Sequence, residues 1–548
     1  MMPSTRTPLG LSRRGVLKGA LLAAAASAVG PALAACSESG TSSSAGDTLV
    51  VALTSFGSES SVPWLIGGPE QGLWAQVYDK LIVLNKDTYA LEPSLATSWE
   101  PSSDYTSWTV KIRPGVRFHE NYGELTSTDV AYSIQQYTAK TATGSSTGTW
   151  LLNPPTSYDT RDATTVVLHF ASPNWMVPDL LATGGQLNIV SKKYFDQVGV
   201  KAAASHPIGT GPYHFVSGRP GQEYAFAAVP NHWRKTPAFA NLRVRLIPDA
   251  STSLLAVRAG EVDVAVVGST FLKQASQANI RVLENQLGSP GWLIYPGLSK
   301  PGRPDYQPQF PWVGDANDPR SLANAKLVRE ALALAVNKQA IIDNVFFGHA
   351  KNSPFGFFVL PVFPFASNSW TPLPYDPARA KQLLAQAGYP NGFSIEMATS
   401  PLHPDGADLT QAISQDWQAI GVTTRLNNVP LQTLLSSMKA RHNRMTVTYA
   451  SPVATNPTSN LGLISTNILN LVANGAAIDD DIKRIESETD QTKRYALEHD
   501  LSQYLYDQHY GLMLPSRNAT WVVSKKVGDW ATLGFLNAPH NYEYITKA

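Results

Sequence analysis

Short apolar runs alternate with helical patterns along most of the chain, and this alternation constrains the fold more than any other feature. Runs rich in Val, Leu and Ile predict buried strands at Thr48–Leu53, Leu242–Ile247 and Val262–Val267. The segment Asp376–Gly388 predicts a helix, because it has an acidic N-cap, Pro377 at the first helical position and a glycine at its end. Interleaved strands and helices indicate α/β lobes.

Two further stretches predict helices, and one predicts a loop. A helical pattern runs from Ala325 to Phe347 and stops at Gly348, and long charged helices are expected between Asp479 and Tyr506. The stretch Pro301–Pro319 is rich in Pro, Gly and Asp and has no period, so we expect a long surface loop. A chain of 548 residues that is 43% apolar is longer than a single hydrophobic core usually accommodates. We therefore expect two or three domains.

Charge and cysteine content exclude several classes of partner. Lys and Arg number 43 against 42 Asp and Glu, and charged residues make up 16% of the chain, so no basic surface for nucleic acid is expected. The single cysteine, Cys36, excludes a disulfide within the chain and a multi-thiolate metal site. The 11 histidines have no metal-ligand spacing and no phosphate-binding loop occurs, so we expect neither a cofactor nor a resident metal.

Residues 1–35 have the order of an export signal: paired arginines at Arg13 and Arg14, an Ala/Leu-rich stretch, and small residues before Cys36. The paired arginines resemble a twin-arginine signal, and Leu-Ala-Ala-Cys resembles a bacterial lipobox, whose cysteine is lipidated. Residues 36–46 are small and polar and predict a flexible tether. The alternative is an uncleaved membrane helix with Cys36 unmodified.

Short motifs spread over nearly the whole chain after the tether occur in an order found in one protein family. They are Glu92–Glu100, Trp108–His119, Thr128–Ser133, Pro207–Tyr213, Asn231–Trp233, Val257–Asp263, Val328–Leu332, Tyr375–Tyr389 and Ile420–Val422. Together they resemble the bacterial extracellular solute-binding family five, the receptors of dipeptide, oligopeptide and nickel importers. The resemblance implies a class II periplasmic-binding-protein fold, an α/β fold of two lobes with a hinge plus an extra α/β domain.

The resemblance also implies domain boundaries and a function. Lobe I is expected to comprise residues 47–83, 207–287 and 525–548, the extra domain residues 84–206, and lobe II residues 288–524. The implied protein is a monomeric, substrate-binding lipoprotein of an ABC-type importer, anchored outside the cell membrane by lipid, in the periplasm if the host has an outer membrane. Its partners are a peptide or other small organic solute, bound between closing lobes, and the permease and ATPase subunits.

Glycine motifs within these segments predict turns rather than contacts with ligand. Gly209, Gly211 and Pro212 are expected to form a tight turn in which glycine tolerates positive φ, and Arg113–Gly115 predicts another.

The first group of candidate ligand residues follows the predicted strand Met445–Tyr449. In peptide-binding members of the family an aspartate pairs with the peptide's α-amino group, but Val453 stands at or near that place here. A buried ammonium group without a partner is costly, so either the acid comes from elsewhere or the ligand lacks a free α-amino group there. Four residues in this region have hydroxyl, amide or aromatic groups that could contact a neutral or blocked ligand. The alternative is that they only order the loop after the strand. They are Tyr449, Ser451, Thr455 and Asn456.

Other candidates come from aromatic and basic residues. Trp292 and Tyr295 lie where relatives have a cleft strand and are expected to stack on ligand or to belong to the core. Phe56, like Glu59, follows the first strand and is a weaker candidate of the same kind. Arg441 belongs to a local positive cluster that suits a ligand carboxylate or, alternatively, a solvated surface.

Two serine motifs raise a different function, which we do not favour. Gly144–Gly148 has the G-x-S-x-G pattern around Ser146, but its flanks predict a linker, and Ser436–Lys439 has the S-x-x-K pattern without its companion motifs. We therefore predict that the protein is not an enzyme. The alternatives are a secreted acyl-serine hydrolase and an orphan solute receptor used in sensing or cell-wall peptide recycling.

Overall fold

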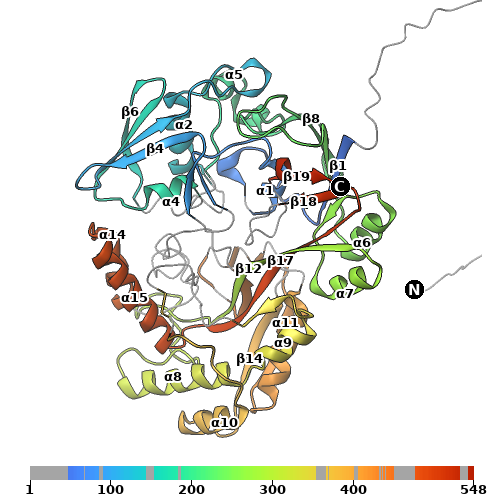
Figure 1. Ribbon diagram of the computed structural model, residues 1–548. Helices are drawn as coiled ribbons and strands as arrows, with labels where there is room; N and C mark the ends of the chain where they lie inside the picture. The colour runs from blue at the N-terminus through green and yellow to red at the C-terminus, as the bar shows by residue number, and fades with distance from the viewer. Residues whose placement is uncertain are drawn as a thin grey trace, which may run out of the picture. The chain divides into compact units, whose positions relative to one another are not determined.

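The structure is a computed structural model (Figure 1) that divides into two units, Met1–Ser43 and Ser44–Ala548, and all described residues belong to the second. The residues that it describes are 47–66, 68–85, 90–142, 153–182, 187–352, 366–367, 369–399, 405–430, 433–434, 436–437, 440–442, 444–449, 476–530 and 541–548. The predicted export signal, Cys36 and the tether lie outside these residues. No helix within the described ranges is long and apolar enough to span a membrane.

The largest element is an 11-stranded mixed sheet. Its strands, in spatial order, are β15 (Thr423–Asn428), β14 (Ser394–Thr399), β16 (Thr446–Tyr449), β12 (Arg281–Ile294), β17 (Leu512–Val523), β11 (Val264–Ala265), β1 (Thr48–Leu53), β10 (Asn241–Leu246), β9 (Glu223–Ala228) and β8 (Tyr213–Arg219), with β13 (Ala350–Lys351) paired to β17.

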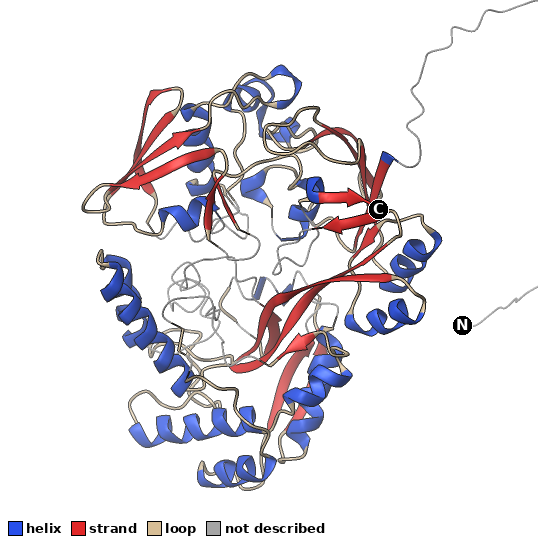
Figure 2. Ribbon diagram, viewed as in Figure 1, coloured by secondary structure: helices blue, strands red, loops and turns tan. Residues whose placement is uncertain are grey.

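Two long antiparallel strands, β12 and β17, lie side by side near the middle of this sheet (Figures 1 and 2). Their pairing runs from Arg281 opposite Val523 to Leu293 opposite Leu512, with irregular register between Asn285 and Gly291. β1 pairs in parallel with β10 and β11, and β14 pairs in parallel with β15 and β16. The antiparallel pair therefore joins two groups of parallel strands.

Three smaller sheets complete the strands. They are β4 (Ala96–Pro101), β5 (Ser107–Ile112), β7 (Thr165–Phe170) and β6 (Pro155–Asp162) in one sheet, β2 (Ile82–Leu84) with β3 (Leu91–Pro93), and β18 (Val527–Trp530) with β19 (Ile545–Lys547).

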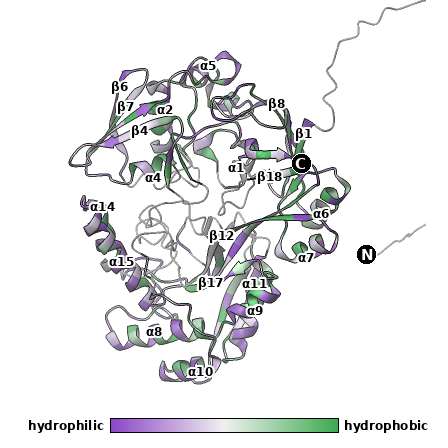
Figure 3. Ribbon diagram, viewed as in Figure 1, coloured by the Kyte–Doolittle hydropathy of each residue, from purple (hydrophilic) through white to green (hydrophobic). Residues whose placement is uncertain are grey.

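The helices are α1 (Gly68–Trp74), α2 (Ser127–Thr138), α4 (Val177–Ala182), α5 (Lys192–Ala203), α6 (Ala250–Ala259), α7 (Ser269–Gln277), α8 (Pro319–Leu334), α9 (Lys338–Asn344), α10 (Pro377–Gln386), α11 (Gly406–Gln418), α14 (Ala476–Ser487) and α15 (Gln491–Asp507). Several helices, α7 and α11 among them, carry hydrophobic residues toward one face and hydrophilic residues toward the other (Figure 3), as expected where one face packs on a core.

The best-capped helix of the sequence is confirmed. Asp376 accepts a hydrogen bond from Arg379 N at 2.8 Å, Pro377 begins α10, and Gly388 follows the helix with φ +94°. The strand predicted at Thr48–Leu53 is β1, residue for residue. The charged region after Asp479 forms α14 and α15, also as predicted.

Two element predictions were wrong in extent. The single helix expected from Ala325 to Phe347 is two, α8 and α9, because the side chain of Asn337 accepts a hydrogen bond from Ala340 N at 2.9 Å and begins a second helix. The strand expected at Val262–Val267 is only Val264–Ala265, because the chain then leaves the sheet to begin α7 at Ser269.

The stretch Pro301–Pro319 contains no strand, and α8 begins only at its last residue, but it is not wholly a surface loop. Asp305, Trp312 and Val313 are buried, and the indole of Trp312 donates a hydrogen bond to Pro296 O at 2.8 Å. Aromatic and apolar side chains therefore hold this loop against the end of β12.

Gly209 and Gly211 are required for a reason other than the expected one. Neither has positive φ, but a Cβ at Gly209 would overlap the carbonyl oxygen of Val77 and one at Gly211 would overlap that of Gln76. Close approach of two backbones therefore requires glycine at both positions. The turn expected at Arg113–Gly115 does contain a positive φ, +76° at Gly115.

Candidate functional site

The site begins where two strands end, one from each group of parallel strands. β11 ends at Ala265 and leads to α7, while β14 ends at Thr399 and is followed by α11. In open α/β sheets, ligands bind outside the carboxyl ends of the strands, where the connections diverge. The first residue of α7, Ser269, and the residue before α11, Asp405, are therefore placed where a ligand site is expected.

Asp405 joins three elements. Its carboxylate accepts hydrogen bonds from Ser269 N at 2.8 Å and from the Ser269 hydroxyl at 3.1 Å. The guanidinium of Arg517, on β17, donates to the same carboxylate at 3.3 Å. All three residues are buried. A negative charge at the N-terminus of α7 is stabilised by the helix N–H groups and by the nearby cation.

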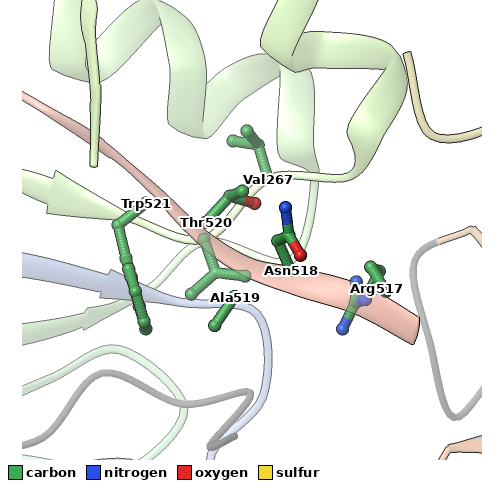
Figure 4. A pocket seen from close by; sticks show the side chains of 7 residues that line it. Val267, Arg517, Asn518, Ala519, Thr520 and Trp521 are labelled. Carbon is green, nitrogen blue, oxygen red and sulfur yellow. The ribbon is translucent and has the colours of Figure 1, made fainter. Parts of the chain in front are cut away.

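A hollow lies beside this cluster, along one edge of β17 (Figure 4). On this edge β17 pairs with β11 through Val522 and Val523 and with β13 through Ser516 and Arg517. Residues 519–521 pair with β12 on the opposite edge, but on this edge no strand of the described ranges pairs with them. The hollow occupies this gap and is lined by Val266, Val267, Arg517, Asn518, Ala519, Thr520 and Trp521.

Two polar atoms of the lining are buried without a hydrogen-bond partner within the described part of the chain. They are Asn518 Oδ1, an acceptor, and Trp521 Nε1, a donor. The amide nitrogen of Asn518 donates to Glu284, whose carboxylate also lies 3.0 Å from His349 Nδ1, so the orientation of the Asn518 amide is set by a neighbour. Buried polar atoms in native proteins nearly always have a partner, so each of these two atoms is expected to hydrogen-bond to a small polar group such as water.

The indole of Trp521 is held in place by other aromatic rings. Its ring lies 5.3 Å from that of Trp530, and Trp530 stacks on Tyr542 at 6.3 Å. The hydroxyl of Tyr542 donates to Gly72 O at 3.1 Å, so the stack is anchored on α1. A rigid indole can present its N–H with little loss of conformational freedom.

Two aromatic candidates from the sequence lie in or beside β12. Trp292 is buried and is opposite Thr448 on β16 and Met513 on β17. Tyr295 is buried and stacks on Trp312 at 6.2 Å, and burial raises the pKa of its hydroxyl. The packing of Tyr295 favours the interpretation that it belongs to the core.

Phe56 and Glu59, in the turn after β1, both contact the hairpin of β8 and β9. Phe56 is 2% exposed and meets Tyr224 edge to face at 5.4 Å. The carboxylate of Glu59 accepts hydrogen bonds from Tyr224 OH at 2.6 Å and from Gly221 N at 3.0 Å. These contacts give both residues a structural role.

Arg441 is paired within the protein. Its Nε and Nη2 atoms lie 3.1 and 2.6 Å from Asp305 Oδ2, which ties this residue to the loop before α8. Tyr449 is the last residue of β16, and its backbone is opposite Gly291. Ser451, Val453, Thr455 and Asn456 lie outside the described residues, as does the G-x-S-x-G segment with Ser146.

The second serine motif is described only at its first half. Ser436 and Ser437 are helical, and the Ser437 hydroxyl donates to Leu434 O at 2.8 Å, while Lys439 lies outside the described residues. Within the described ranges no group of three or more His, Cys, Asp or Glu side chains is arranged to hold a metal ion.

Sequence reasoning missed the cluster of Ser269, Asp405 and Arg517, as well as Asn518 and Trp521. One signal was present, because Leu512–Val523 is an apolar strand that contains an arginine and an asparagine, both of which are buried. Buried polar residues within an apolar strand indicate a functional or structural polar contact. The partners of Arg517 could not be identified in this way.

Comparisons with known proteins support one family. The family model of the bacterial extracellular solute-binding proteins, family 5 Middle, matches residues 90–468. Heme-binding protein A of Haemophilus influenzae is 30% identical over 383 residues, 64% of each chain. The dipeptide-binding protein of Escherichia coli is 27% identical over 379 residues, 64% of this chain and 65% of that one. The matched region thus spans less than two thirds of the relatives' length.

Solved structures show the fold. NikA from Brucella suis in complex with Fe(III)-EDTA has a TM-score of 0.77 and 21% identity, covering 91% of this chain and all of that one. DppA from Helicobacter pylori in complex with the peptide STSA has a TM-score of 0.74 and 24% identity, with 91% and 98% covered. These matches confirm the predicted periplasmic-binding-protein fold. The chain belongs to the bacterial extracellular solute-binding proteins, family 5.

Proposed function

We propose that this protein is the substrate-binding component of an ABC-type importer, capturing a peptide or a related small organic solute and delivering it to a membrane permease. The proposal rests on the family and on one observation in the structure. That observation is the hollow on β17, whose lining residues Asn518 and Trp521 each bury a polar atom, Oδ1 and Nε1, without a partner within the described part of the chain.

The chemistry of the hollow favours an amide-like ligand group. The charge of Arg517 is opposed by that of Asp405, with Nη1 and Oδ2 3.3 Å apart, so the lining is close to neutral. The unpaired acceptor of Asn518 matches an N–H group of a peptide bond. Trp521, three residues further along β17, projects from the opposite face of the strand (Figure 4). Buried polar groups of this kind discriminate strongly against ligands that leave them unpaired.

The ligand is enclosed by closure of two lobes, with residues 47–83, 207–287 and 525–548 in lobe I, 84–206 in an extra domain, and 288–524 in lobe II. The chain then passes from lobe I to lobe II within β12 and returns just after β17, which ends at Val523. The register irregularity between Asn285 and Ser289 supports this division, because it lies at the boundary between residues 287 and 288. A hinge of few strands permits rigid lobes to move.

The protein acts outside the cytoplasm, held at the outer face of the cell membrane by lipid on Cys36, and carries out no covalent chemistry. The basic, apolar and small-residue regions that precede Cys36 support the anchor. Replacement of Cys36 by serine should release the protein from the membrane fraction, whereas retention of the variant there would contradict lipid anchoring.

Ligand binding is tested by thermal shift of the purified protein against di- to pentapeptides with free or acetylated N-termini, opines, sugars, haem and nickel chelates. A ligand at ~100 times its Kd adds about 2.7 kcal/mol of apparent stability. Stabilisation by peptides supports the proposal. Stabilisation by sugars or metal chelates alone would overturn the peptide assignment, and labelling by a fluorophosphonate or β-lactam probe would contradict the absence of covalent chemistry.

A further inference from the structure

The proposed extra domain contacts proposed lobe II directly. This contact does not involve β12 and β17, the strands that link lobe I to lobe II. The indole of Trp175, just before α4, donates a hydrogen bond to Ile485 O on α14 at 3.1 Å, across 310 positions of sequence. The guanidinium carbon of Arg494, on α15, lies 3.8 Å from the centre of the Trp175 ring. α4, α14 and α15 are labelled in Figure 1.

Both partners are held rigidly by their own surroundings. Next to Trp175, Asn174 O accepts a hydrogen bond from Trp108 Nε1 at 2.7 Å, and Asn174 N donates to Tyr105 O at 2.9 Å. Arg494 lies in the first turn of α15, and its Nη1 donates to Glu488 O at 3.2 Å. The two side chains therefore meet without much further loss of conformational freedom.

Burial strengthens the contact. Trp175 is 5% exposed and Arg494 6%, and a cation over an indole is attracted more strongly when water is excluded. Burial lowers the pKa of Arg494, while the acidic groups of Glu498 and Asp179 favour its charged form. Asp179 belongs to α4 and Glu498 to α15, so negative charge from both sides of the contact stabilises the guanidinium.

We propose that Trp175 and Arg494 form a latch that stabilises the closed conformation of the protein before ligand binds. This inference rests on the proposed closure of two lobes. The strands that link the lobes pack against α6, α7, α8 and α9, whereas α4 packs against β2 and β3, and α14 packs against α15. Hinge motion in β12 and β17 would therefore separate Trp175 from Arg494 without breaking the core of either part.

The latch can be tested without a ligand by electron paramagnetic resonance distances in the full chain. Spin labels are placed at Ser103→Cys and Asp500→Cys, both exposed, in a Cys36→Ser background, which removes the only native cysteine. The unliganded protein should show a population at the separation of these positions in the structure, together with a longer one.

Arg494→Gln should lower the ratio of short to long populations about tenfold, the scale of a desolvated cation–π contact. Trp175→Phe keeps a ring but removes the N–H donor, and should lower the ratio roughly fivefold. The matched control is Arg484→Gln, which removes the same charge from an arginine that is 64% exposed on α14. The control should leave the ratio unchanged.

Absence of the short population in the spin-labelled protein that keeps Trp175 and Arg494, or equal ratios in all variants, would overturn the latch. If Arg494→Gln does not fold, Trp175→Phe decides the question, because a ring still fills the site. Neither result bears on the ligand screen, which depends on the hollow at β17, so failure of the latch and failure of the transport proposal remain distinguishable.

Discussion

Asp405 does not cap its own helix but caps that of Ser269, which lies 136 residues earlier in the chain. The backbone N–H of Ser269 and its hydroxyl both donate to the Asp405 carboxylate, at 2.8 and 3.1 Å, whereas α11, which begins directly after Asp405, receives no side-chain cap from it. Arg517 completes the cluster from β17. Three segments far apart in sequence are thus held together at the carboxyl ends of β11 and β14.

Replacing Asp405 by asparagine should destabilise the protein by about 3–5 kcal/mol, because the buried carboxylate that accepts from Ser269 and pairs with Arg517 would be lost. Urea unfolding measures the difference. Asp408→Asn is the matched control, since Asp408 is also in the first turn of α11 but is exposed, and it should change stability by less than about 1 kcal/mol. Equal effects of the two substitutions would show that the cluster is unimportant for folding.

Replacing Trp521 by phenylalanine should weaken ligand binding about tenfold, because the ring is kept but the buried donor of a residue that lines the hollow is lost. Titration calorimetry with the best ligand of the screen measures the change. Trp74→Phe is the control, because Trp74 also has a buried indole N–H without a partner in the described ranges but does not line the hollow. If Trp74→Phe weakens binding equally, the hollow is not the ligand site.

Local patterns predicted local structure well. Thr48–Leu53 reads as a strand because six apolar or β-branched residues are bounded by polar ones, and α10 could be placed because its N-cap, proline and glycine are adjacent in sequence. The family motifs supplied the fold. The break at Asn337 was missed because apolar periodicity continues across it, and only the contact between Asn337 and Ala340 N shows where a new helix begins.

The site could not be predicted in the same way, because it depends on the register of strands. Nothing local to Asp405 indicates that it meets Ser269, and nothing local to Arg517 indicates that it lies 3.3 Å from Asp405. Those contacts follow from the order β12, β17, β11 in the sheet. Arg441 shows the opposite error. Its sequence context suggested contact with a ligand carboxylate, but in the structure it is paired with Asp305.

Replacing Gly209 by alanine should destabilise the protein by about 3 kcal/mol, because the new Cβ would overlap the backbone carbonyl of Val77, which cannot move aside as a side chain can. Thermal unfolding followed by circular dichroism measures the change. Gly221→Ala is the comparison, because Gly221 has φ +69° but open space around it, and it should cost about 1 kcal/mol. A larger effect at Gly221 would show that backbone conformation outweighs close approach.

Stability should depend on the protonation of His119. Burial, the largest cause, lowers the pKa of His119 to about 4, although the hydrogen bond between its Nε2 and Gly211 O at 2.9 Å opposes the shift. His214 and His232 also lower this pKa, and Asp79 raises it. The pKa of histidine in an unfolded chain is about 6.5, so as pH falls the unfolded chain binds the proton first.

His119 should therefore leave stability unchanged above about pH 6.5 and reduce it progressively as pH falls toward about 4, by up to about 3 kcal/mol in total. Urea unfolding at several pH values measures this slope. His119→Gln, whose amide can still donate to Gly211 O, should make the slope shallower. His206→Gln alters an exposed histidine paired with Glu120 and should retain the slope of the parent protein. An unchanged slope in His119→Gln would assign the acid sensitivity to other groups.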